Sequence, residues 1–454
     1  MTQRRLLRGG TVLTMDDDHG DLPQGEVLIE DDRIAAVGTD LGVEDAEVID
    51  TRGKIVIPGF IDTHRHTWET AIRGCAPNAT LDDYFVEVLD SFAPVYRPED
   101  VYHSNLAGSL ECLHAGITTL VDWSHINNTP DHPDAAIQGL QEAGIRSQYA
   151  YGSANTSLAD YWFESKIAVP SDDVRRIRDT YMPTDDGLLT MALATRGPGF
   201  CTDEVVTQEW NLARELGIPV TVHVGMGRLA GRFSMVKNLH RLGLLGAGDV
   251  YVHSCYLDDE EWGLVRDSGG HISVAAQVEL QMGHGCPPCQ RSVAEGLRPS
   301  LSVDVVTTVP GDMFTQMRAA FGIERFNTLS ECWTSDVDPP ETMVKARDVL
   351  AMATIHGAEG AGVADRTGSL TPGKKADVTV IDATAPNMAP LIDPVAAVVI
   401  SADVSNVETV IVDGQIRKQD GRLVESFDRA RQLVESSRDH LVQQVDRDPA
   451  WISV

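Results

Sequence analysis

The chain has 454 residues, of which 42% are apolar and 23% charged, a composition typical of folded globular proteins. Its 68 acidic residues outnumber 37 basic ones, and the net charge of −31 argues against a nucleic-acid partner. The first residues, MTQRRLLRGG, lack the apolar stretch of a secretory leader, and no run approaches the roughly 20 apolar residues of a membrane span.

The two ends of the chain follow the same β-rich pattern. Residues 1–57 contain short alternating runs such as GTVLTM and EVLIEDDRIAAVG, joined by turn residues. Residues 368–424 repeat the pattern in GSLTPGKKADVTVID and NVETVIVDGQIRKQDGRL. Each flank alone is too small for a stable β domain. We therefore expect the flanks to form one composite β-sandwich domain.

Residues 58–367 alternate β-rich runs with helical patterns. One such helix is TDEVVTQEWNLARELG, with Thr202 as its N-cap and Gly217 as its stop. Eight strands that are apolar on both faces predict an α/β fold, a closed (β/α)₈ TIM barrel inserted in the sandwich. The runs are KIVIPGFIDTH, AGITTLVDW, AGIRSQYAYG, GLLTMALATRG, GIPVTVHVG, GDVYVHSC, GGHISVAA and RPSLSVDVV.

The last segment, residues 425–454, contains the amphipathic pattern DRARQLVESSRDHLVQQV. It predicts a C-terminal helix that covers either an edge of the barrel or a partner subunit.

Polar side chains fall at the carboxyl ends of the predicted barrel strands, where such barrels carry their chemistry. His64 and His66 follow the first strand, and their spacing of two places them on one side of it. His223 belongs to the fifth strand, His253 to the sixth and Asp304 to the eighth. Neutral imidazoles with a carboxylate suit a catalytic divalent metal, zinc above iron(II).

The other histidines are interpreted as core or surface groups, except two whose loops could overhang the barrel mouth, His125 and His284. Seven cysteines, an odd number spread thinly, fit a reduced cytoplasm better than a disulfide framework. Cys286 and Cys289 have CxxC spacing, but a structural zinc site needs a second pair. We expect two free thiols there and a cytoplasmic protein.

The segments PGFIDTHRH, VTVHVG, YVHSC, LSVDVV and GSLTPGKKADVTVID resemble the amidohydrolase superfamily, in its branch of cytosine deaminase, guanine deaminase and triazine hydrolases (chlorohydrolases). The resemblance implies that His64, His66, His223 and Asp304 hold one metal ion per subunit. It implies that His253 polarises the substrate or holds the metal-bound water. It also implies a homodimer or a higher homo-oligomer. LATRG, at the end of the fourth strand, has no lysine to bridge a second metal.

The deaminase branch carries a glutamate three residues after the histidine of the fifth strand, and this chain has Met226 there. The loss is large, because general acid–base help is worth about 10²- to 10⁴-fold in rate. Glu69, three residues after His66, and Glu279, in the loop after the seventh strand, are candidate replacements. For the substrate pocket, Trp68, Tyr84 and Trp123 are candidate walls for a flat ring.

These features predict a metal-dependent hydrolase of carbon–nitrogen bonds other than peptide bonds. Metal-bound hydroxide would attack a small nitrogen heterocycle and Asp304 would take the proton, as in a deaminase. The alternatives are hydrolysis of an amide, urea or carbamate, or of a carbon–chlorine bond, and the missing glutamate favours the first of these. A third alternative is a non-hydrolytic metal-binding pseudoenzyme or a lyase.

Overall fold

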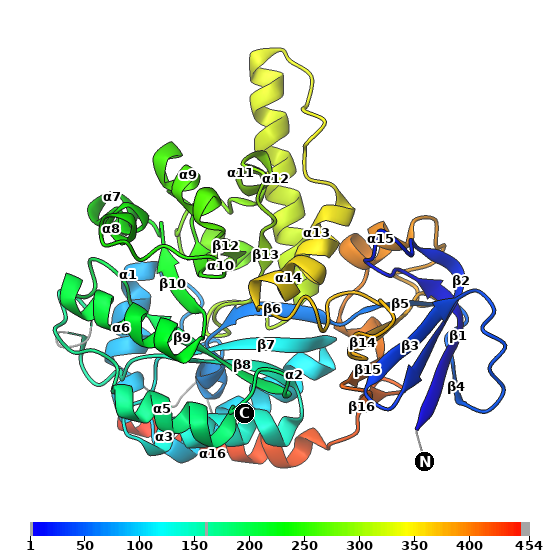
Figure 1. Cartoon of the computed structure of the whole chain (residues 1–454), viewed down its shortest axis with the longest axis horizontal. Helices are drawn as coiled ribbons and strands as arrows, with labels where there is room; N and C mark the ends of the chain where they lie inside the picture. Colours follow the sequence, from blue (N-terminus) through cyan, green and yellow to red (C-terminus); the bar gives the residue numbers. More distant parts are fainter. Residues whose placement is uncertain (1–2, 159–161, 446–454) are drawn as a thin grey trace.

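Two sheets organise the chain in a computed structural model that describes residues 3–158 and 162–445 (Figure 1). The first sheet holds eight parallel strands in sequence order, as the eight apolar runs predict, except that the first half of the first run, Lys54–Pro58, belongs to the second sheet. They are β6 (Phe60–Arg65), β7 (Ile117–Ser124), β8 (Arg146–Tyr151), β9 (Leu189–Thr195), β10 (Val220–Val224), β11 (Val250–His253), β12 (His271–Val274) and β13 (Ser300–Leu301).

The barrel closes between its last and first strands through residues of the predicted metal site. The His66 amide donates to the Asp304 carbonyl at 2.9 Å, and the Asp304 amide donates to the His64 carbonyl at 2.9 Å. A parallel bridge pairs Arg65 with Asp304. Closure of the barrel therefore fixes the backbone of three predicted metal ligands at once.

Helices follow the barrel strands and cover the outside of the sheet (Figure 1). Helix α6 shows how the sequence sets their limits: Thr202 is its N-cap, and Gly217 ends it with a left-handed φ of +65°. The helices of this region are α1 (Leu81–Tyr84), α2 (Pro98–His114), α3 (Asp131–Ala143), α5 (Ser171–Tyr181), α6 (Asp203–Leu216), α7 (Leu229–Phe233), α8 (Met235–Arg241), α9 (Asp259–Ser268), α10 (Ala276–Gln281), α11 (Cys289–Ala294), α12 (Met313–Ser335), α13 (Ala346–Met352) and α14 (Ile355–Gly360).

Strands from both ends of the chain form the second sheet, a single mixed sheet of nine strands at the right of Figure 1. Its two halves meet where β5 pairs antiparallel with β14. Apolar side chains from both halves, including Val56 and Val380, share one buried core. The strands are β1 (Arg4–Val12), β2 (Leu22–Glu30), β3 (Arg33–Gly38), β4 (Glu47–Asp50), β5 (Lys54–Pro58), β14 (Val378–Asp382), β15 (Val407–Val412), β16 (Gln415–Gln419) and β17 (Arg422–Leu423).

A buried ion pair connects the two sheets. Arg146, the first residue of β8, donates from Nε to Asp377 at 2.6 Å and from Nη2 to Asp413 at 2.9 Å. The Arg146 and Asp377 side chains are almost fully buried. A charge pair that is removed from water this completely depends on both partners, so it couples the barrel to the composite sheet.

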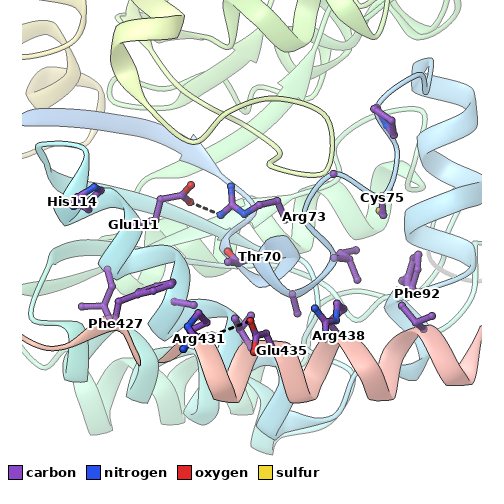
Figure 2. A pocket seen from close by; sticks show the side chains of 18 of the residues that line it. Thr70, Arg73, Cys75, Phe92, Glu111, His114, Phe427, Arg431, Glu435 and Arg438 are labelled. Atoms are coloured by element: carbon purple, nitrogen blue, oxygen red, sulfur yellow. Dashed lines mark hydrogen bonds and ion pairs between the residues drawn. The ribbon is translucent and has the colours of Figure 1, made fainter. Parts of the chain in front are cut away.

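The C-terminal helix α16 (Phe427–Gln444) packs against α2 and the 3₁₀ helix η1 (Thr67–Ile72). A cavity of about 1280 Å³ lies between α16 and these elements, with Arg73 bound to Glu111 along its wall (Figure 2). None of the predicted metal ligands lines this cavity. The helix thus covers the outer layer of the barrel, one of its two predicted positions.

Helix α12 is the longest described helix and stands out from the body of the molecule (Figure 1). Its far half carries two exposed aromatic side chains, Phe326 and Trp333. Cys286 and Cys289 are free thiols, and Cys286 accepts a hydrogen bond from Asn327 of this helix. Among the described helices, none combines the length and the apolar composition that crossing a membrane requires.

Candidate metal centre

Four imidazoles and one carboxylate converge at the carboxyl ends of the barrel strands. Asp304 Oδ1 lies 3.2 Å from Nε2 of His64 and 3.4 Å from Nε2 of His66. His223 Nε2 is 3.1 Å from His64 Nε2, and His253 Nε2 is 3.8 Å from the other oxygen of Asp304. The most compact subset is His64, His223, His253 and Asp304, whose ligand atoms all lie within 4.8 Å of one another.

Hydrogen bonds to the outer nitrogens set the tautomers of two of these imidazoles. His66 Nδ1 donates to the Trp123 carbonyl at 2.9 Å, which leaves the Nε2 lone pair facing Asp304. His253 Nδ1 lies 3.2 Å from Glu279 Oε1, so its Nε2 also faces the centre. Lone pairs aimed at one point beside a carboxylate are the donor set of a zinc or iron(II) site, so these residues fit a divalent cation.

Burial keeps the predicted ligands in the state that binds metal. It lowers the pKa of His64 and of His223 well below the ordinary value, and the repulsion that protonated neighbouring imidazoles would exert lowers both further. Burial also lowers the pKa of His66, against the opposing effect of Asp304. The imidazoles are therefore neutral near pH 7, and a neutral imidazole is the form that coordinates a cation.

The backbone is strained at two residues of the centre. His253 has a φ of +72° and Asp304 a φ of +69°, both in the left-handed region that few residues other than glycine adopt. Such conformations cost about 1–3 kcal/mol each and persist where the surrounding structure holds them. Here the strain turns the ends of β11 and the segment after β13 toward the centre.

Glu69 lies in η1 and is completely buried. Tyr84 donates to its Oε1 at 2.5 Å and Thr307 donates to its Oε2 at 3.1 Å. Burial raises its pKa well above the ordinary value, and the nearby charge of Asp304 raises it further. Both oxygens of Glu69 are thus occupied by hydroxyl groups, behind the wall of the pocket.

Glu279, in α10, supports the centre from behind. Its Oε1 accepts from the Ala275 amide at 2.8 Å and lies 3.2 Å from His253 Nδ1. Burial raises the pKa of Glu279, while His253 lowers it. The carboxylate therefore orients the outer side of His253.

A pocket of about 40 Å³ opens onto the centre and is lined by His66, His223, His253 and Asp304. Among the candidate substrate residues, Tyr84 lines this pocket. Trp123 lies behind it with its ring edge-on to those of His64, His66 and His223, and Trp68 packs against Tyr96 and His125. The outer wall is aromatic, formed by Phe85, Trp162 and Phe200.

Three further polar residues line the pocket, and two of them lie on the loops that the sequence places near the mouth. These are His125 and His284, and burial lowers the pKa of His284 to about 3. The third, Arg196, follows β9, donates to the Ile167 carbonyl and was missed. Its place at the end of the fourth strand, in the segment LATRG, is the signal that could have found it.

Several known proteins resemble this chain over most of its length. Residues 55–417 match the model of the amidohydrolase family. A 5'-deoxyadenosine deaminase of Methanosarcina mazei is 28% identical, over 92% of this chain and 94% of its own length. A 5-methylthioadenosine/S-adenosylhomocysteine deaminase of Pyrococcus abyssi is 26% identical, over 92% of this chain and 95% of its own.

Solved structures share the whole fold. The atrazine chlorohydrolase of Arthrobacter aurescens, complexed with zinc, superposes with a TM-score of 0.82 at 25% identity, over 96% of this chain and 100% of its own. An adenosine deaminase of Xanthomonas campestris with bound zinc gives a TM-score of 0.82 at 21% identity, over 98% and 99%. The barrel and the composite sheet therefore recur together in these structures.

Proposed function

Since this chain belongs to the amidohydrolase family, we propose that it is a metal-dependent deaminase of a small nitrogen heterocycle. One observation carries the proposal: four imidazoles and the Asp304 carboxylate converge at the mouth of the barrel, and the tautomers of two of these imidazoles leave lone pairs facing inward. The reaction class is hydrolysis of a carbon–nitrogen bond, and the substrate is a small molecule.

In this proposal His64, His66, His223 and Asp304 hold one divalent ion per chain, zinc before iron(II). Nitrogen-rich donor sets with one carboxylate favour these metals. Zinc is also the ion named for the Arthrobacter aurescens chlorohydrolase. The cation supplies hydroxide near neutral pH by lowering the pKa of a water molecule.

The other roles in the reaction belong to side chains of the site. Asp304 accepts the proton that the attacking water loses, through Oδ2, the oxygen that lies on the side of His253 rather than between His64 and His66. His253, whose Nδ1 is held by Glu279, presents its Nε2 lone pair to the centre, where it accepts a hydrogen bond from the attacking water. The Tyr84 hydroxyl is held by Glu69, which fixes this wall of the pocket. Trp68 and Trp123 stiffen the histidines from behind.

The names of the relatives suggest which compounds to test first, because several act on adenine nucleosides. We propose an amino group on an aromatic nitrogen ring as the group that leaves. The free cysteines among the described residues support a reducing compartment such as the cytoplasm. A homo-oligomer is proposed on the family resemblance alone.

Metal analysis and ammonia release test this function together. The purified protein should contain about one zinc or iron per chain and release ammonia from at least one of 5'-deoxyadenosine, guanine, cytosine or melamine. His64→Ala should lose the metal and lower kcat/KM by more than about 100-fold, because it removes a ligand from the centre. His240→Ala, a change of the same kind at an exposed position of α8, should retain both.

The outcomes separate the alternatives. If the protein releases no ammonia from the four amino compounds but hydrolyses amides, ureas or carbamates, then its reaction is amide hydrolysis rather than deamination. Chloride release from a chlorinated triazine would support the chlorohydrolase alternative. A protein without stoichiometric metal, or a His64→Ala variant with full activity, would contradict a metal-dependent hydrolase altogether.

A further inference from the structure

One position beside the metal centre holds a residue that cannot transfer a proton. Met226 lies three residues after His223, and its side chain lines the pocket together with His223 and Asp304. A thioether neither donates nor carries a proton at neutral pH. Hydrolytic deamination needs a group that moves a proton to the nitrogen of the substrate, so another residue must face this side of the pocket.

Neither carboxylate that the sequence offers faces the substrate. Glu69 receives hydroxyl hydrogen bonds on both of its oxygens, from Tyr84 and Thr307. Glu279 uses one oxygen for His253 and the Ala275 amide, behind the imidazole. Neither glutamate lines the pocket, whereas His284 does.

His284 lines the pocket on the side where a proton-transfer group is needed. Its side chain is 3% exposed, and neither ring nitrogen has a hydrogen-bond partner among the described residues. Its ring lies edge-on to His253, with 4.5 Å between the ring centroids. A buried imidazole with two unsatisfied nitrogens costs free energy, unless a ligand or water completes its bonding.

The backbone holds His284 next to Met226. The Gly227 amide, which directly follows Met226, donates to the His284 carbonyl at 2.7 Å. Gly285 has a φ of +140°, and a Cβ at this position would lie 2.6 Å from the Cβ of Cys255. The segment Gly283–Gly285 is therefore packed tightly between the loops that follow β10 and β11, and the imidazole has a fixed place.

We propose that His284 is a catalytic residue that performs the proton transfer which Met226 cannot. The inference rests on the proposed function and deepens it. A neutral imidazole carries one proton and one lone pair, so it can accept a proton at one nitrogen and give one from the other.

The step balances as follows. The oxygen of water bonds to the ring carbon that bears the amino group, and His284 moves a proton from that water to the adjacent ring nitrogen. The carbon–amino bond then breaks, and the amino group leaves as ammonia with the second proton of the water, which passes through Asp304. The product keeps the oxygen as a carbonyl, and His284 returns to its neutral state.

Three variants test the role, assayed on whichever of the four amino compounds above the wild-type protein converts fastest. His284→Ala should lower kcat by about 10²- to 10³-fold without loss of metal or of thermal stability. His284→Gln keeps a hydrogen-bonding side chain but cannot relay a proton. It should bind the same compound to the chelator-treated protein with a dissociation constant within about threefold of the wild type, yet turn it over as slowly as His284→Ala.

The third variant introduces a proton carrier at position 226. Met226→Glu placed in the His284→Ala background should raise kcat at least tenfold, because the glutamate re-creates a proton carrier at the same side of the pocket. A His284→Ala variant within threefold of the wild type would overturn the inference. A double variant no faster than His284→Ala would overturn the claim that the two positions share one role.

The result that would contradict the proposed function differs from the results that would contradict the role of His284. A wild-type protein that releases no ammonia from any of the four compounds contradicts deamination itself, whatever His284 does. His240→Ala serves again as the control for a histidine removed from an exposed helix, and it should match the wild type in kcat and in binding.

Discussion

Glu324 is a buried carboxyl group that the chemistry of the barrel does not use. It lies on α12, 3% exposed, against the first residues of α11. Burial raises its pKa to about 7, although the amides of Cys289 and Gln290 partly offset the effect. An ordinary glutamate in the unfolded chain has a pKa of about 4.3. The folded protein therefore binds more protons than the unfolded chain between these two values.

This difference predicts a pH-dependent contribution to stability. The contribution of Glu324 falls as pH rises from about 4 to 7, because deprotonation leaves a charge in a buried place. Glu324→Gln should be more stable than the wild type by about 3–4 kcal/mol at pH 8 and equal to it at pH 4, by urea unfolding. Glu331→Gln, an exposed position of the same helix, should change neither value. Equal stabilities of Glu324→Gln and wild type at pH 8 would contradict the assignment.

At the same scale, the sequence predicted residues on strands better than residues on loops. His64, His66, His223, His253 and Asp304 converge as predicted, because the ends of parallel strands meet at one edge of a barrel. Loop residues have no such rule. His284 was only placed near the mouth, since its position depends on contacts such as the hydrogen bond between Gly227 and His284, whereas Arg196 was missed although it directly follows a strand.

Single elements of the fold obey local rules closely. The limits of α6 follow from Thr202 and Gly217, and the left-handed φ of Gly217 points its missing Cβ into open space. Eight apolar runs predicted eight barrel strands, yet β13 shortens to Ser300–Leu301. The chain leaves regular pairing there so that Asp304 can bridge to Arg65. Propensity could not show this shortening, because tertiary contacts determine it.

Two glycines that differ in φ give opposite predictions. Gly217→Ala should destabilise the protein by about 1 kcal/mol, because a Cβ is disfavoured in the left-handed conformation. Gly322→Ala, at an exposed position inside α12 with nothing within 4 Å of the added Cβ, should stabilise it by about 0.5–1 kcal/mol. Urea unfolding of both variants measures the contrast. The same sign for both would refute this account of the cap.

For the molecule as a whole, the composite sheet could be predicted because neither flank can bury its own apolar face. The order of its strands could not, since the pairing of β5 with β14 depends on register between segments far apart in the chain. The sequence also gave no sign of the Arg146 ion pair, because Asp377 and Asp413 lie more than 200 residues away. This pair holds the barrel against the sheet.

Replacing Arg146 should show how much its ion pair between the barrel and the composite sheet contributes to the free energy of unfolding. Arg146→Met leaves Asp377 buried without its cation, so we expect a loss of about 3–5 kcal/mol in the free energy of unfolding. Arg175→Met, which breaks the exposed pair with Glu215, should cost at most about 1 kcal/mol. Chemical denaturation measures both, and equal small losses would show that the barrel and the sheet are held by packing alone.

The pairing of β5 with β14 also affects the nascent chain while the ribosome synthesises it. More than 300 residues separate the two strands, which takes about 15–60 s to synthesise at 5–20 residues per second. Throughout that interval the apolar strand Lys54–Pro58 has an open edge, the kind of surface on which nascent chains aggregate. The nascent N-terminal strands must therefore wait for their partner, and this protein depends on protection during synthesis more than a barrel with contiguous domains would.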